Sequence, residues 1–408
     1  MSGVSVDHVV SVIVLLAAIV LFVGLFDSTL SSAVTYQRNT STANECNNLL
    51  DSILLTPAVP TSGSPSWFGL QGSALPNYNL DPFALMRLDS SAGTPISYQK
   101  TGLTYSAIIT SPNNYLLYPF SDVINYSTAS TLLGLNGIYG FQLSLTPTVN
   151  VSITQTSINP QPLSLSLNVR GVGFPLANAQ VNYLLIPIQL GGSYPKFETI
   201  SNQMGTVQTG ATGSVTITFS NFSPNQNLIY AFVAYAYLDG ITGIGYYVSS
   251  PVGNQSIVPF LDPLSTLSVT LANSNDIPVT SSQSYSLSYN STFIFESENY
   301  QFEQTSLSSS NSFGSVTSGS GYSPVTISMS SYTPGILVIA YENAGNNGVV
   351  MMPWGFSSLD FSLTFGRLPI NQSWIATDLR QVEVNGVSYQ AKLSLWSMQS
   401  TGSFQGVV

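Results

Sequence analysis

The sequence predicts a mainly β protein: a long N-terminal α-helix, for a membrane or for helix assembly, followed by immunoglobulin-like antiparallel β-sandwich domains. Three observations predict this fold class. The run from Val9 to Phe26 is apolar and uncharged over about the length that a bilayer requires. The remainder is rich in short stretches of alternating apolar and polar residues, separated by turn residues. Hydrophobic residues make up 44% and aromatic residues 11% of the chain, which favours packed cores over disorder.

The first unit, residues 1–56, is expected to be one helix from about Val6 to Leu55. The segment from Asp27 to Leu55 contains neither Pro nor Gly, and Pro57 follows it. The first half is expected in lipid and the second half on the exterior domain or on a neighbour. That second half has apolar residues at the amphipathic spacing i, i+3, i+4 and i+7, namely Cys46, Leu49, Leu50 and Ile53. Cys46, the single cysteine, is expected to be a buried thiol.

The exterior is expected to hold three β-rich domains. Their predicted ranges are 57–160 for a first β-rich domain, 161–256 for an immunoglobulin-like sandwich, and 257–408 for a C-terminal β-rich domain. The middle domain has the clearest pattern, and its stretch Leu228–Leu238 is apolar on both faces. The C-terminal range is expected to contain an exposed loop at Ser306–Ser323 and one strand at Val382–Leu395.

Charge is scarce in this chain. Charged residues make up only 6% of it and the formal net charge is -10. Nucleic acid is excluded as a partner, because no basic patch is available to neutralise phosphates. A surface of hydroxyl and amide groups does not titrate as carboxylates do, so we expect the exterior to tolerate acid.

Seven Asn-x-Ser/Thr sequons are candidates for N-glycosylation. Such glycans require exposure on a secreted fold, so the sequons support an extracellular placement. The candidate residues are Asn39, Asn125, Asn150, Asn221, Asn254, Asn290 and Asn371.

No catalytic, cofactor-binding or metal-ligating residue is assigned, and a non-enzymatic protein is expected. The single histidine, His8, precedes the apolar run, so neither a Ser-His-Asp triad nor an HExxH zinc site is available in the exterior. Glu296 and Glu298 would share one face of a strand, with Glu303 nearby, but an exposed polar face is the preferred interpretation. The alternative is a secreted, membrane-anchored acid hydrolase of the protease type, although no Asp lies in a D-[ST]-G turn.

Three stretches near the N-terminus suggest a family. They are NNLLDSILLTP (Asn47–Pro57), WFGL (Trp67–Leu70) and LDPFALMRL (Leu80–Leu88). Together with the helix before them, they resemble archaeal cell-surface proteins with a type IV pilin-like N-terminal helix. The chain differs from a type IV prepilin because no Lys or Arg precedes the apolar run.

The resemblance implies a role in the archaeal cell envelope. The expected function is a structural or adhesion protein of the cell surface, either a pilin-like filament subunit or a single-span anchored protein. The expected partners are the lipid bilayer and, through the helix, copies of the chain or other surface-layer or pilus subunits. Glycans or other cells are further candidates for contact with the exterior.

Overall fold

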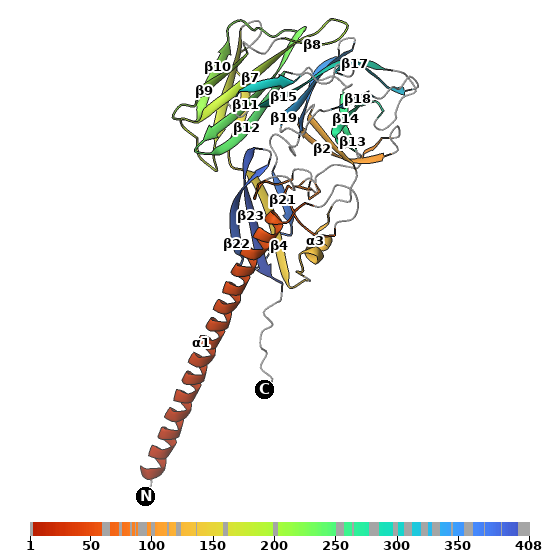
Figure 1. Cartoon of the computed structure of the whole chain (residues 1–408). Coiled ribbons are helices and arrows are strands. Elements are labelled where there is room, and N and C mark those ends of the chain that lie inside the picture. The colour runs from red at the N-terminus through yellow and green to blue at the C-terminus, as the bar shows by residue number, and fades with distance from the viewer. Residues whose placement is uncertain are drawn as a thin grey trace.

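The structure is a computed structural model of the whole chain. It describes residues 3–58, 66–72, 76–81, 84–85, 87–88, 96–98, 103–111, 114–119, 124–135, 137–157, 162–198, 203–249, 257–262, 265–276, 285–296, 301–305, 312–319, 325–328, 335–343, 346–354, 362–370, 372–384 and 386–398. Figure 1 shows a long helix that projects from a β-rich head.

The helix α1 runs without a break from Gly3 to Leu55. This confirms the single long helix predicted from the sequence. Its last turns lie against the head, and most of its length lies outside it (Figure 1). A short helix, α3, covers Tyr126–Leu132 and is capped by Asn125, whose side chain accepts a hydrogen bond from the Thr128 backbone N–H.

A four-stranded sheet, here called the base sheet, receives the end of α1. Helix α1 contacts two of its strands, β22 and β23. In spatial order its strands are β21 (Leu363–Gly366), β4 (Tyr139–Pro147), β23 (Val387–Ser397) and β22 (Ala376–Val384).

The other four sheets form four consecutive layers, and the first two make one β-sandwich. The first layer is β10 (Ser214–Phe219), β6 (Leu163–Arg170) and β5 (Asn150–Gln155). The second layer is β12 (Ile241–Ser249), β11 (Leu228–Leu238), β7 (Gln180–Gln189) and β8 (Lys196–Phe197), with β9 (Met204–Gln208) also on β7.

The third and fourth layers make a second β-sandwich. The third is β16 (Phe302–Thr305), β15 (Ser286–Glu296), β19 (Gly335–Asn343) and β20 (Asn346–Trp354), with β17 (Phe313–Thr317) also on β15. The fourth is β1 (Ile96–Tyr98), β2 (Leu103–Ser111), β3 (Asn114–Pro119), β13 (Ile257–Asp262), β14 (Ser265–Asn273) and β18 (Val325–Ser328). Among the described strand pairs, only β3 with β13 is parallel.

Alternating side chains bind the layers together. On β11, Phe232 and Ala234 pack in the core shared with the first layer, whereas Ala231 and Val233 pack in the core shared with the third. The prediction that this strand is apolar on both faces is confirmed. The first and second layers approach so closely that a Cβ atom on Gly245 would clash with the Val151 carbonyl oxygen.

Strand pairing crosses the expected domain limits. Strand β4 pairs with β21 and β23, and β3 pairs with β13, so strands from residues 57–160 complete sheets with strands from 257–408. The ranges 57–160 and 257–408 are therefore not separate units of strand pairing, and the pair of β5 with β6 crosses the limit at residue 160. The sandwich of the first two layers is built from its expected range apart from β5.

Two local expectations are wrong. The single strand predicted at Val382–Leu395 is a hairpin of β22 and β23, which turns at Gly386 with a positive φ of 78°. The exposed loop predicted at Ser306–Ser323 contains β17, which pairs with β15 and buries Val316 in the second sandwich.

Candidate functional site

The projecting length of α1 is the first part of the candidate site. Its large apolar side chains between Val9 and Phe26 are between 50% (Ile19) and 69% (Phe22) exposed. The helix is long and apolar enough to cross a membrane, and no part of its most apolar stretch is buried in the head. This uncovered apolar surface requires either lipid or other apolar helices to remove it from water.

A polar segment separates the apolar run from the head. In this segment the hydroxyl groups of Thr29, Ser32 and Thr35 donate hydrogen bonds to backbone carbonyls four residues earlier. These bonds satisfy the hydroxyls within the helix and leave its backbone continuous. The head is therefore joined to the apolar run by a continuous helix rather than by an irregular linker.

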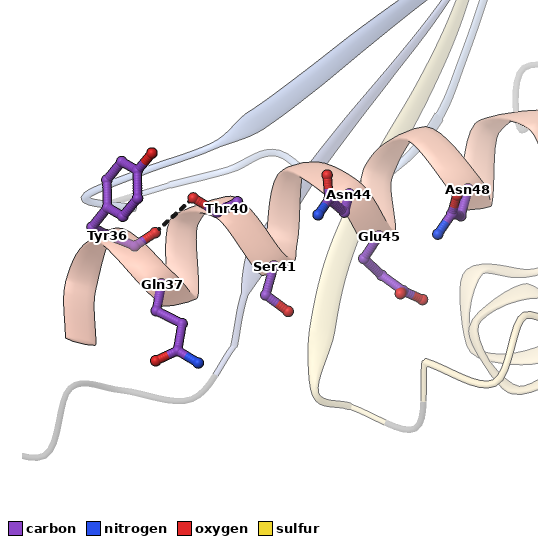
Figure 2. Close-up of a pocket in the computed structure, with 7 residues that line it drawn as sticks. All are labelled: Tyr36, Gln37, Thr40, Ser41, Asn44, Glu45 and Asn48. Atoms are coloured by element: carbon purple, nitrogen blue, oxygen red, sulfur yellow. Dashed lines mark hydrogen bonds between the residues drawn. The ribbon is translucent and has the colours of Figure 1, made fainter. Parts of the chain in front are cut away.

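A shallow, open depression of about 440 Å³ follows this segment along the outer face of α1 (Figure 2). All of its lining residues belong to the helix, and they carry amide, hydroxyl, phenol and carboxylate groups. They are Tyr36, Gln37, Thr40, Ser41, Asn44, Glu45 and Asn48. The depression is too open to exclude water, so it has the form of a contact surface rather than of an enclosed active site.

The amphipathic end of α1 is seated in the head, as predicted. Thr42, Cys46, Leu50 and Ile53 are all at most 2% exposed. Cys46 Sγ lies 3.5 Å from the Leu393 carbonyl oxygen on β23. Burial raises the pKa of the Cys46 thiol to about 11, so the thiol is neutral and unreactive in the folded chain.

One ionic cluster ties α1 to the base sheet. Arg380 on β22 lies with Nε 3.0 Å from Asp51 Oδ1 on α1, and its guanidinium also pairs with Asp378 at 2.8 Å. The Tyr78 hydroxyl donates to the same Asp51 carboxylate at 3.3 Å. Hydrogen bonding to Asp51 raises the pKa of Arg380 further above its already high value. The cluster fixes how the helix meets the sheet but is partly exposed, so its net stabilisation is small.

The structure separates the predicted glycosylation sites into groups. Asn125, Asn150 and Asn221 are exposed. Asn39 is half-buried within α1, and Asn290 is half-buried on β15, where its Nδ2 donates to the Pro195 carbonyl oxygen at 2.8 Å. An amide nitrogen held in this way is not free to carry a glycan in the folded chain. The remaining two, Asn254 and Asn371, lie outside the described residues.

The carboxylates weighed as a pair do not share one exposed face. Glu296 is half-buried between the second and third layers, so its assignment to an exposed polar face is wrong. Glu303 pairs with Phe295 rather than with Glu296, which places it on the opposite face of the sheet, and Glu298 lies outside the described residues. Among the described residues, no group of three or more His, Cys, Asp and Glu side chains is arranged to hold a metal ion.

Sequence reasoning missed the residues around Glu296. They are Asn182 on β7 and Tyr237 on β11, more than fifty residues earlier in the chain. No local pattern could have joined them to Glu296, because the contact exists only once the two sandwiches are packed. The hairpin at Gly386 did have a local signal, the dipeptide Asn385-Gly386.

Comparison with known proteins identifies no family. No protein-family model matches the chain, and no curated protein sequence matches it. Among solved structures, 68% of the chain is similar to alpha-2-macroglobulin from E. coli, with 10% identity, a TM-score of 0.21 and coverage of 19% of that protein. Similarly, 62% of the chain is similar to red sea bream transglutaminase, with 9% identity, a TM-score of 0.17 and coverage of 37% of that protein. The chain thus spans much less than two thirds of either protein, and similarities this weak carry no argument about function.

Proposed function

We propose that the chain is a non-enzymatic structural or adhesion protein of the cell surface, with a β-rich head held outside the cell by α1 as a single-span membrane anchor. One observation carries the proposal. The same unbroken helix is uncovered and apolar from Val9 to Phe26 and buries one stripe of side chains in the head between Thr42 and Leu54. A bilayer covers an apolar surface of this length on every side, and the buried end couples the anchor to the head.

A pilin-like filament subunit of the archaeal type is the second candidate, and a separate observation favours it. Apolar and aromatic side chains remain exposed beyond the apolar run, at Leu30 (48%), Val34 (53%) and Tyr36 (75%). Leu30 and Val34 are four residues apart and lie on one face, which is the spacing that packs helix on helix. In this version α1 packs against copies of itself and the heads decorate the outside.

Fractionation of intact cells that express the full chain tests both versions. The cells are sheared, the supernatant is sedimented at high speed, and all fractions are blotted. A membrane-bound protein released only by detergent is the result expected for the anchor, and a pellet of sheared fibres is the result expected for the filament. A full-length chain that stays monomeric in the supernatant without detergent would overturn both.

A further inference from the structure

The contact between the two β-sandwiches is apolar along most of its length. Side chains of the second layer, such as Ile186 and Val233, share one core with side chains of the third layer, such as Ile294 and Val338. Because both sheets use their opposite faces for separate cores, this contact is what joins the two sandwiches. A polar group buried in this contact costs free energy unless it is hydrogen-bonded, so its state affects the stability of the contact between the sandwiches.

A carboxyl group occupies one end of this contact. Glu296, the last residue of β15, lies on the same face of the sheet as Ile294, toward the second layer. Its Oε1 accepts a hydrogen bond from Asn182 Nδ2 at 3.1 Å, and its Oε2 accepts one from the Tyr237 hydroxyl. One side chain of the second sandwich is therefore held by two side chains of the first.

The partners of Glu296 are themselves held in place. Asn182 is only 2% exposed, and its Oδ1 accepts hydrogen bonds from Thr206 Oγ1 at 2.9 Å and from Gln180 Nε2 at 3.2 Å. These two bonds orient the amide so that its nitrogen points at Glu296. The ring of Tyr237 stacks on that of Tyr235, with ring centroids 6.5 Å apart.

The surroundings of Glu296 disfavour its charged form. Burial raises the pKa of Glu296 to about 7, and the hydrogen bond from Asn182 opposes only part of that shift. Among the described residues, the titratable groups that face it are Tyr235 and Tyr237 on β11, while Glu303 lies on the other face of the sheet. Burial and the nearby Glu296 raise the pKa of Tyr235, so this phenol stays neutral. No described Lys or Arg forms an ion pair with the carboxyl.

We propose that Glu296 is a pH-sensitive lock between the two sandwiches, which as the neutral acid holds β15 against β7 and β11 and as the carboxylate weakens their contact. In the neutral acid Oε2 carries the proton and donates a hydrogen bond to the Tyr237 hydroxyl oxygen, while Oε1 still accepts from Asn182. The sign follows from the raised folded-state pKa. Below pH 4.5 the carboxyl group is neutral in both the folded and the unfolded chain, and its contribution to the free energy of unfolding is fully present. As the pH rises toward 7 the unfolded chain loses this proton first, so the contribution is lost. The head is thus fastened most firmly in acid.

Urea unfolding of the full chain in detergent, at pH 4.5 and at pH 8, tests the lock. The variant Glu296→Gln keeps the shape and an acceptor but carries no charge at either pH. Glu303→Gln is the matched control, because it removes an exposed carboxylate from the neighbouring strand on the opposite face. Each pKa unit is tenfold in the unfolding constant, and partial exposure of Glu296 reduces that effect. For the parent chain and for Glu303→Gln, we expect the equilibrium constant for unfolding to be about tenfold larger at pH 8 than at pH 4.5.

The variant Glu296→Gln is expected to lose most of that tenfold difference. Hydrogen exchange provides a local readout, which global unfolding does not give. The protection of backbone amides in β11 and β15 should fall at pH 8 in the parent chain and remain in Glu296→Gln. An equal pH dependence in the parent chain and Glu296→Gln would overturn the proposal. So would a loss of protection at pH 8 that spares β11 and β15.

Discussion

The two ends of α1 both carry large apolar side chains and have opposite environments. Between Val9 and Phe26 the helix is apolar on every side, and its large side chains are exposed. Between Thr42 and Leu54 only one stripe is apolar, and this stripe is buried against the base sheet. The described chain provides a cover for one end of the helix and none for the other.

The difference shows that apolar content alone does not determine burial within a chain. An amphipathic stripe matches one flat partner, such as the face of a sheet. A helix that is apolar all round needs a partner on every side, which lipid or several neighbouring helices supply and a single sheet does not. The apolar run of α1 is therefore the part of this protein whose partner is external.

The largest expected effect comes from placing charge in the apolar run. The double substitution Leu16→Lys with Val20→Lys puts two ammonium groups at its centre, and each costs roughly 3 kcal/mol in a membrane. We expect the protein to leave the carbonate-washed membrane pellet, as judged by blotting. Ser31→Lys, which is exposed and lies beyond the run, is the control and should remain in the pellet. Unchanged pelleting of the double variant would remove the distinction between the two ends.

A smaller effect is expected at the buried end. Leu50 is fully buried against the head, so Leu50→Ala should destabilise the junction by about 2–5 kcal/mol. Thiol labelling of Cys46 at pH 8 measures this locally, because burial raises the pKa of its thiol to about 11 and the parent chain should label very slowly. We expect labelling to be accelerated about 100-fold in Leu50→Ala. Ser52→Ala, on the exposed side of the same turn, should label as slowly as the parent chain, and equal rates in both variants would contradict the assignment.

The smallest effect is expected at the ionic cluster. Arg380→Gln removes the cation between Asp51 and Asp378, and partly exposed pairs of this kind contribute about 1 kcal/mol or less. We expect a small decrease in the urea midpoint at low salt. In about 0.5 M NaCl the decrease should be smaller, because salt screens the ion pairs. Arg38→Gln, on the exposed part of α1, should leave the midpoint unchanged. A decrease as large as that of Leu50→Ala would mean that charge, rather than the apolar stripe, holds the helix.

Much of the candidate site could be predicted before the structure. The apolar run, the extent of the helix and the burial of Cys46 all follow from local spacing, because neighbouring turns of one helix decide them. The strand Leu228–Leu238 was predicted as apolar on both faces because its residues are apolar or aromatic throughout. The environment of Glu296 could not be predicted, because Asn182 and Tyr237 reach it only across the contact between two sandwiches.

By itself, the sequence determined the long helix, many of the extended stretches and which of their faces are apolar. Only the tertiary structure decided which strands pair: β4 joins β23, and β3 joins β13, across more than a hundred residues. It also decided that the Asn290 amide is engaged while that of Asn221 lies exposed. The physical reason is that periodicity records whether a face must be covered, whereas the identity of the cover depends on shape and on the packing of distant segments.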